Sequence, residues 1–159
     1  MTTDTPSDTL YRHSQTYTLL WLIDAVLAAI CVPMVLGTDD TSARGGIALV
    51  LGVLLALPVL LGRLVIRVDA QAVHWHFGYV GWPAWSQPLK GIGVTEVSKA
   101  NVYFGSGIKG GQLHRQYNVT MNGPALRLHL ADGRKITLGT PEPQRLQAVI
   151  EARLTREMH

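Results

Sequence analysis

Two long apolar runs near the N-terminus dominate the hydrophobic pattern of this chain. They cover residues 18–36 and 45–62, and only the short polar segment GTDDTSAR separates them. Each run is long enough for a membrane-spanning helix, because about 20 residues at a rise of about 1.5 Å cross the roughly 30 Å of apolar bilayer core. The pattern therefore predicts a membrane hairpin of two helices.

The flanks of this hairpin favour one orientation. The linker carries one cation, Arg44, while Arg12 precedes the first run and Arg63 and Arg67 follow the second. Because Lys and Arg concentrate on cytoplasmic flanks, we expect a multi-pass protein of the cell (inner or plasma) membrane with both termini in the cytoplasm. A cleaved signal peptide is the alternative for the first run, but its apolar stretch exceeds the usual length of about 7–15 residues and a second run follows at once.

Asp24 is the one charged residue inside the first run, and the second run offers it no polar partner. A charged carboxylate is costly inside a bilayer, so Asp24 must be protonated, reach water, or meet a polar group of another chain. Three interpretations follow: a contact between chains, a proton or ion relay, and an acid that reaches the interface. Small residues beside it, Ala25, Ala28 and Ala29, permit the close helix approach that the first interpretation needs.

After residue 63 the pattern changes to short runs with β-type alternation, bounded by turn residues. These runs predict seven strands, at residues 64–69, 73–77, 84–89, 92–99, 115–121, 125–130 and 134–140. The Asp132-Gly133 pair predicts a tight hairpin between the last two strands. Residues 1–17 are expected to form a polar N-terminal tail, disordered at its start.

An amphipathic helix is expected at the C-terminus. Thr140 can cap it, Pro141 suits the first helical position, and Glu142 favours the positive end of the helix. Leu146, Val149, Ile150 and Leu154 recur with helical spacing and form its apolar stripe.

The order of elements, seven strands and then one helix, resembles small bacterial membrane proteins that carry a two-helix anchor and a pleckstrin-homology-like (PH-like) domain. The stretches that carry the resemblance are FGYVGWPAW, YFGSGIK and DGRKITLGTPEP, within residues 64–154. The resemblance implies a membrane α-helical hairpin plus an α+β soluble domain at 63–159, a β-sandwich or barrel capped by a C-terminal α-helix. It also implies a non-enzymatic binding or scaffold role.

Charge and cysteine content narrow the picture. The net charge is +3, and cations outnumber carboxylates only after residue 62. A basic domain beside an anionic cytoplasmic leaflet is electrostatically favourable, although such a charge also serves solubility alone. The single cysteine, Cys31, excludes an intrachain disulfide and a zinc site built on cysteines.

A glycine-rich segment supplies the first candidate site. Gly105, Gly107 and Gly110 fit G-x-G-x-x-G, but the following residues predict a strand rather than the helix that a dinucleotide site requires. The remaining interpretation is a nest of backbone N–H groups that, with Lys109, contacts a lipid phosphate or another anion.

Histidine and tryptophan pairs supply further candidates. His74 and His76 share one strand face, but two imidazoles are too few for zinc, so no metal site is expected unless His114 or His129 lies near. Of Trp82 and Trp85, one is expected in the core and the other partly exposed. Trp21, at the start of the first run, fits an interfacial anchor.

No nucleophile lies in a recognisable catalytic motif, so we expect a non-enzymatic membrane protein that binds protein or assembles with itself. No cofactor and no nucleic acid is expected. The expected partners are the lipid bilayer and a second copy or another membrane protein. The alternatives are an accessory subunit of a transporter or channel in which Asp24 titrates, and an anionic-lipid-binding module.

Overall fold

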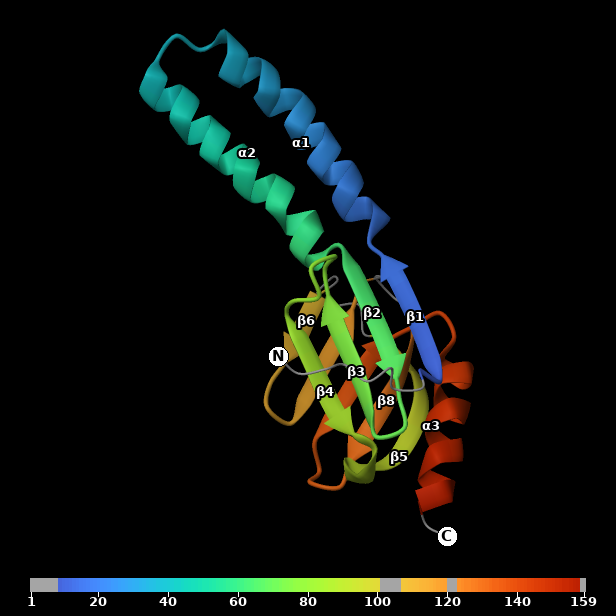
Figure 1. Cartoon of the computed structure of the whole chain (residues 1–159). Coiled ribbons are helices and arrows are strands. Elements are labelled where there is room, and N and C mark those ends of the chain that lie inside the picture. Colours follow the sequence, from blue (N-terminus) through green and yellow to red (C-terminus); the bar gives the residue numbers. More distant parts are fainter. Residues whose placement is uncertain (1–8, 101–106, 120–122, 158–159) are drawn as a thin grey trace, which may run out of the picture.

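Two long helices extend from one end of a β-rich domain in the computed structural model of the chain (Figure 1). The structure describes residues 9–100, 107–119 and 123–157. The helices are α1 (Thr18–Gly37), α2 (Thr41–Leu61) and the C-terminal α3 (Pro143–Glu157). The strands are β1 (Tyr11–Thr16), β2 (Arg63–Val68), β3 (Ala72–Phe77), β4 (Ala84–Pro88), β5 (Ile92–Lys99), β6 (Gly107–Gly110), β7 (His114–Asn118), β8 (Pro124–Leu130) and β9 (Lys135–Gly139).

The predicted helical hairpin is present, and both helices are long and apolar enough to cross a membrane. Only 6% of the most apolar window of each helix is buried, whereas a core helix of a soluble protein would be mostly covered. Helix α2 begins four residues before the apolar run, because the Asp40 carboxylate caps it by accepting hydrogen bonds from the N–H groups of Ser42 (2.8 Å) and Ala43 (3.4 Å).

The hairpin interrupts a pair of neighbouring strands. β1 leads into α1, α2 leads into β2, and these two strands pair side by side along their whole length. The Tyr17 N–H donates to the Gly62 carbonyl at 2.7 Å, which joins the two ends of the hairpin.

A loop of the domain also contacts the hairpin. The loop after β3 lies against the end of α2, where the Tyr79 N–H donates to the Val59 carbonyl at 2.9 Å. The Tyr79 ring meets the Trp21 ring edge-on at 6.2 Å, and the Arg63 guanidinium lies 5.4 Å from the Tyr79 ring centre. Because Val80 and Trp82 in this loop are exposed, apolar side chains continue from the helix ends onto the domain.

The strands form two sheets that face each other. The four-stranded sheet has the order β1-β2-β3-β4, and the five-stranded sheet has the order β5-β8-β9-β7-β6. All described pairings are antiparallel except that of β7 with β9. The expected β-sandwich is therefore present in coarse form, but no pairing among the described strands closes the two sheets into a barrel.

Nine described strands replace the seven expected ones, for two different reasons. β1 lies inside the segment assigned to the polar tail; its alternation of Tyr11 with polar residues is too weak to show a strand, and its pairing with β2 stabilises it. β6 lies in the glycine-rich segment, where Gly107 and Gly110 have φ angles of +114° and +91°. A glycine-rich pattern with such backbone angles does not predict a strand.

The core lies between the sheets and under α3. Alternate residues of β2 and β3 point inward, and Leu146 and Ile150 of the predicted helical stripe are fully buried. Helix α3 starts at Pro143 rather than at Pro141, so Pro143 occupies the first helical position. The Thr140 hydroxyl accepts a hydrogen bond from the Glu142 N–H at 3.3 Å before the helix begins.

Candidate functional site

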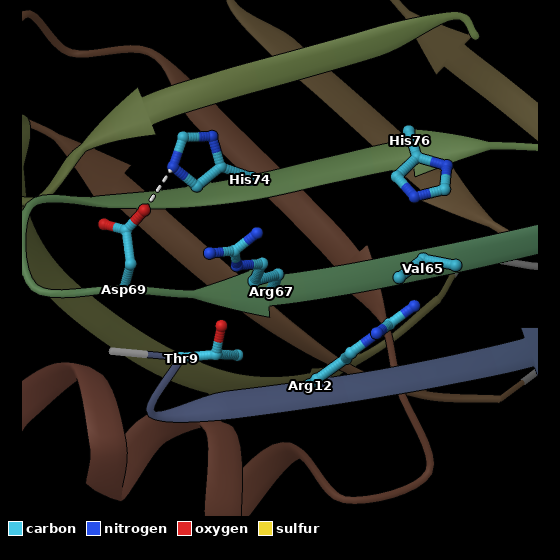
Figure 2. Close-up of a pocket in the computed structure, with 7 residues that line it drawn as sticks. All are labelled: Thr9, Arg12, Val65, Arg67, Asp69, His74 and His76. Atoms are coloured by element: carbon cyan, nitrogen blue, oxygen red, sulfur yellow. Dashed lines mark hydrogen bonds and ion pairs between the residues drawn. The ribbon is translucent and has the colours of Figure 1, made fainter. Parts of the chain in front are cut away.

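The outer face of the four-stranded sheet carries an open hollow of about 440 Å³ (Figure 2). Its lining residues come from the three neighbouring strands β1, β2 and β3 and from the turns beside them. They are Thr9, Arg12, Val65, Arg67, Asp69, His74 and His76.

Strand alternation and register bring these side chains together. Val73, Trp75 and Phe77 face the core, so the alternate residues His74 and His76 face outward. Arg67 is paired with Arg12 on one side and with His74 on the other, which places three basic side chains in one row across the sheet.

Asp69 borders one end of the hollow and holds the turn between β2 and β3. Its Oδ1 accepts hydrogen bonds from the N–H groups of Gln71 and Ala72, both at 2.9 Å, and its Oδ2 lies 2.8 Å from His74 Nε2. Burial raises the pKa of the Asp69 carboxyl, but these hydrogen bonds and the His74 ring outweigh it, so the net pKa lies below the ordinary value. The carboxylate therefore stays ionised and orients His74.

The chemistry of this hollow suits an anionic group. Two guanidinium groups supply donors, and guanidinium binds carboxylate or phosphate through paired hydrogen bonds. Asp69 is the single carboxylate in the lining, and its oxygens are already used by the turn and by His74. An arriving anion would reduce the repulsion between Arg12 and Arg67, which register places on neighbouring strands.

The hollow lies away from the helices. β2 starts at Arg63, directly after α2, and runs away from the hairpin (Figure 1). Arg67 is about 13 Å further along this strand at about 3.3 Å per residue. The headgroup layer adds only about 5–8 Å on each side of the apolar core, so the basic row lies beyond it if the helices span the bilayer.

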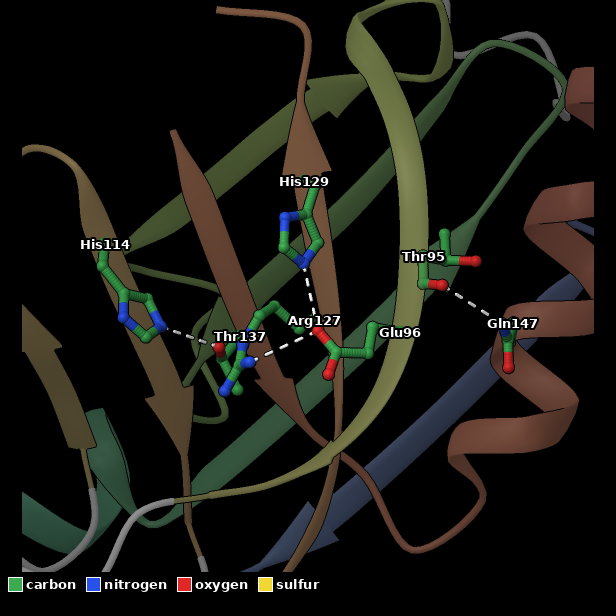
Figure 3. A network of polar contacts seen from close by, with 7 residues as sticks. All are labelled: Thr95, Glu96, His114, Arg127, His129, Thr137 and Gln147. Carbon is green, nitrogen blue, oxygen red and sulfur yellow. Dashed lines mark hydrogen bonds and ion pairs between the residues drawn. The ribbon is translucent and has the colours of Figure 1, made fainter. Parts of the chain in front are cut away.

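A second polar cluster lies on the outer face of the five-stranded sheet (Figure 3). The Glu96 carboxylate pairs with Arg127 at 3.3 Å and with His129 at 3.1 Å. His114 Nε2 lies 3.0 Å from the Thr137 hydroxyl, and burial together with the nearby charges of Arg127, Lys135 and His129 lowers the pKa of His114. The carboxylate of this cluster, Glu96, is thus already paired with Arg127 and hydrogen-bonded to His129.

Further along the same sheet, Gln147 and Glu151 connect α3 to β5. The Thr95 hydroxyl donates to Glu151 at 2.6 Å, and the Gln147 amide donates to the Thr95 carbonyl at 3.3 Å. Figure 3 shows Thr95 and Gln147 beside the Glu96 cluster but separate from it. These contacts fix the helix on the sheet and leave no open site.

The predicted histidine pair is found on one strand face, as expected. His74 and His76 both line the hollow, whereas His114 and His129 belong to the other sheet. The part of the chain that the structure describes holds no group of three or more His, Cys, Asp or Glu side chains placed for a metal ion. The two histidines thus contribute to the lining of the basic hollow.

The glycine-rich candidate is only partly described. Gly105 lies outside the described residues, and Gly107, Lys109 and Gly110 form β6 at the edge of the five-stranded sheet. The Lys109 ammonium is buried and donates to no acceptor among the described residues, and burial lowers its pKa. These three residues do not line the basic hollow, so the sequence motif and the best-formed site are different places.

Asp24 lies on the inner side of the hairpin. Its exposed fraction is 7%, and it makes no hydrogen bond or ion pair within the described ranges. The less exposed residues of α1 recur at helical spacing on the same face, which packs against α2. The carboxyl is therefore covered within its own hairpin.

Of Trp82 and Trp85, one packs on the core and the other is exposed, as expected. Trp85 packs on the core, with its ring centre 6.1 Å from Phe77 and 4.9 Å from Tyr117, while Trp82 is 66% exposed. Trp21 lies at the domain end of α1, at the depth of the Tyr79 loop.

Sequence reasoning missed the contributions of Arg12, Arg67 and Asp69 to the site. Arg12 and Arg67 were noted only as charges that orient the hairpin. A signal does exist, because Arg67 and His74 are both outward positions of adjacent alternating strands, and the turn between these strands fixes their register. Arg12 gives no such signal, since its strand is recognisable only by its pairing.

No protein-family model and no curated protein matches this chain. The features of the chain that bear on its function are the basic hollow and the hairpin to which its sheet is joined.

Proposed function

We propose that this chain is a non-enzymatic integral membrane protein that presents a PH-like domain at the cytoplasmic face, where the basic hollow binds an acidic segment of a partner protein. The observation that carries the proposal is the row of Arg12, Arg67 and His74 across three strands of the open hollow. Cations fixed on a rigid sheet face recognise carboxylates with little ordering cost.

The position of the hollow favours a protein partner over a lipid. The row of basic side chains lies about 13 Å along β2 from the end of the hairpin, which is further than the headgroup layer extends. An acidic loop or tail of a membrane-associated protein can extend this far from the bilayer while its protein stays in the membrane. A phospholipid headgroup cannot extend this far.

Membrane placement is supported by the exposed apolar surface of both helices. Large side chains such as Leu22, Val26, Leu49 and Val53 are between 56% and 70% exposed, which a bilayer would cover and water would not. Both hairpin ends join the same domain, so the side that holds β1 also holds the remainder of the chain. The cation-rich outer flanks favour the cytoplasm for that side.

The test is a titration of the full chain in nanodiscs of zwitterionic lipid. Hexaglutamate is added while the imidazole resonances of His74 and His76 are followed by NMR. We expect saturable shifts that weaken as salt is raised, and at least tenfold weaker binding in the Arg12→Gln/Arg67→Gln variant. The matched control, Arg145→Gln/Arg156→Gln, removes the same charge from exposed positions of α3 and should bind as the unchanged chain does.

Two outcomes would overturn the proposal. The first is equal binding of hexaglutamate by the unchanged chain and by the Arg12→Gln/Arg67→Gln variant. The second is a response of these imidazoles to nanodiscs that contain phosphatidylglycerol but not to hexaglutamate, which would assign the hollow to a lipid.

A further inference from the structure

A second hollow lies where the two sheets fail to close. It occupies about 100 Å³ between the edge strand β4 and the ends of β7 and β9, on the side of the sandwich opposite to α3. Three aromatic residues, Trp75, Trp85 and Tyr117, and three cations, Arg115, Arg134 and Lys135, account for most of its lining. It shares no residue with the basic hollow on the outer face of the four-stranded sheet.

The aromatic wall follows from the register of β3 and β4. Trp75 is paired with Trp85, and both face the inside of the sandwich. The Tyr117 ring of β7 lies 5.2 Å from the Trp75 ring and 4.9 Å from the Trp85 ring, in tilted and edge-on contacts. The three rings thus form one continuous wall beside an opening that neither sheet covers.

Trp75 carries an unused donor at this wall. The residue is 2% exposed, and its indole Nε1–H is buried with no acceptor among the described residues. A buried donor without an acceptor destabilises the fold, and native structures leave few of them. This N–H is therefore a reason to expect an acceptor from outside the chain.

The rim adds positive charge without a counterion. Lys135 alternates with the inward-facing Ile136 and lies on the outer face of the sheet, whereas Arg115 is paired with Ile136 at the opening. Arg115 is exposed and has no carboxylate partner in the described parts of the chain. Arg134 differs, because its guanidinium pairs with Asp132 at 2.6 Å. The opening thus combines an apolar wall, one buried donor and one free cation.

We propose that this opening binds a carboxylate with a planar apolar body. The body packs against the aromatic rings, the carboxylate accepts from the Trp75 indole N–H, and Arg115 neutralises its charge. The hollow is smaller than the apolar cavity of about 150 Å³ that holds one benzene, so part of a single ring enters it and a nucleotide does not fit. Either a small aryl carboxylate or the C-terminal phenylalanine of a peptide has this chemistry.

The test follows the tryptophan indole N–H resonances of the full chain in nanodiscs, with Trp75 assigned by the Trp75→Phe variant. Phenylacetate is the probe, and benzyl alcohol is its uncharged match. We expect a saturable shift of the Trp75 resonance with phenylacetate and at least tenfold weaker binding of benzyl alcohol. Comparison of N-acetyl-Leu-Phe with its C-terminal amide then distinguishes the sources, because a peptide ligand should bind more tightly than phenylacetate and only as the free acid.

Charge variants keep the test independent of folding. Arg115→Gln changes only an exposed side chain and should weaken phenylacetate binding at least tenfold, while Arg156→Gln, on the exposed side of α3, should leave it unchanged. The proposal is overturned if the Trp75 resonance does not respond to either anion, which would mean that the N–H is satisfied over the Tyr117 ring. Equal binding of phenylacetate by Arg115→Gln and Arg156→Gln would overturn it as well. Neither result bears on the binding of hexaglutamate at the basic hollow. The proposal for this second hollow and the proposed function can therefore fail separately.

Discussion

At the scale of single residues, Asp69 connects a turn to the basic hollow. One carboxylate oxygen accepts two backbone N–H groups of the turn, and the other pairs with His74. Because the side chain is 14% exposed, these contacts are little weakened by solvent. The turn and the orientation of a site residue thus depend on the same ionised group.

Replacement of Asp69 separates these two roles. Asp69→Ala should lower the free energy of unfolding by about 1–3 kcal/mol, because two N–H groups lose their acceptor, whereas Asp69→Asn keeps an acceptor and should cost less. The measurement is thermal unfolding of the full chain in detergent, followed by circular dichroism. Equal losses of unfolding free energy in Asp69→Ala and Asp69→Asn would contradict the role of Asp69 as the acceptor for the N–H groups of the turn.

The pH dependence of this residue has a defined sign. Since folding lowers the pKa of Asp69, its ionised form stabilises the fold above the ordinary pKa of 3.8, and this contribution is lost as pH falls through the lowered folded value. The difference between the unchanged chain and Asp69→Asn should therefore be largest near neutral pH and shrink on acidification.

At the scale of elements, the junction between the hairpin and the β domain depends on close backbone contact. Gly78 has a φ of +71°, and a Cβ there would lie 2.5 Å from the Leu60 carbonyl oxygen and 2.7 Å from that of Val59. Only glycine allows the loop to reach the end of α2. The adjoining contacts of Tyr79 with Trp21 and Arg63 then fix the domain against the helices.

Gly78→Ala should therefore destabilise this junction by about 2 kcal/mol or more, since backbone atoms must move. Gly81→Ala is the matched control: its φ is +78°, but the nearest atom to a Cβ there is 3.9 Å away. We expect Gly78→Ala to change the accessibility of Tyr79 to protease or to labelling reagents much more than Gly81→Ala does. Similar effects of both variants would mean that positive φ alone, and not contact with α2, requires glycine.

At the scale of the whole molecule, the hairpin is an insertion between two paired strands of one sheet. β1 precedes it, β2 follows it, and the two run antiparallel in register from Tyr11–Val68 to Thr16–Arg63. Tyr11 contributes to the core with 5% exposure. The β domain therefore includes residues on both sides of the hairpin.

This topology predicts how the domain can be separated from the membrane. A chain of residues 63–159 alone lacks β1, exposes the edge of β2 and opens the core at Tyr11, so it should aggregate or unfold. A chain that keeps residues 9–17 and joins them to residues 62–159 by a short Gly-Ser linker should be soluble and folded, because Tyr17 and Gly62 are hydrogen-bonded neighbours. Solubility and amide dispersion in NMR spectra measure the difference, and a well-folded 63–159 fragment would contradict it.

Much of the fold was predictable because its signals are local. The two helices follow from continuous apolar length, α3 follows from a stripe with helical spacing, and the β8–β9 hairpin follows from Asp132-Gly133, where Gly133 has a φ of +83°. The alternation of β3 placed His74 and His76 on one face. Each signal lies within a few residues of the structure that it specifies.

The sequence alone thus determined the hairpin, most of the strands, the terminal helix and the shared face of the two histidines. Only the tertiary structure decided that β1 belongs to the sheet, that Arg12 lies in a row with Arg67 and His74, and that Trp75, Tyr117 and Arg115 meet where the sheets stay open. The physical reason is that propensity and periodicity act between near neighbours in the chain. Both candidate sites are instead assembled by strand pairing and sheet packing between segments far apart in sequence.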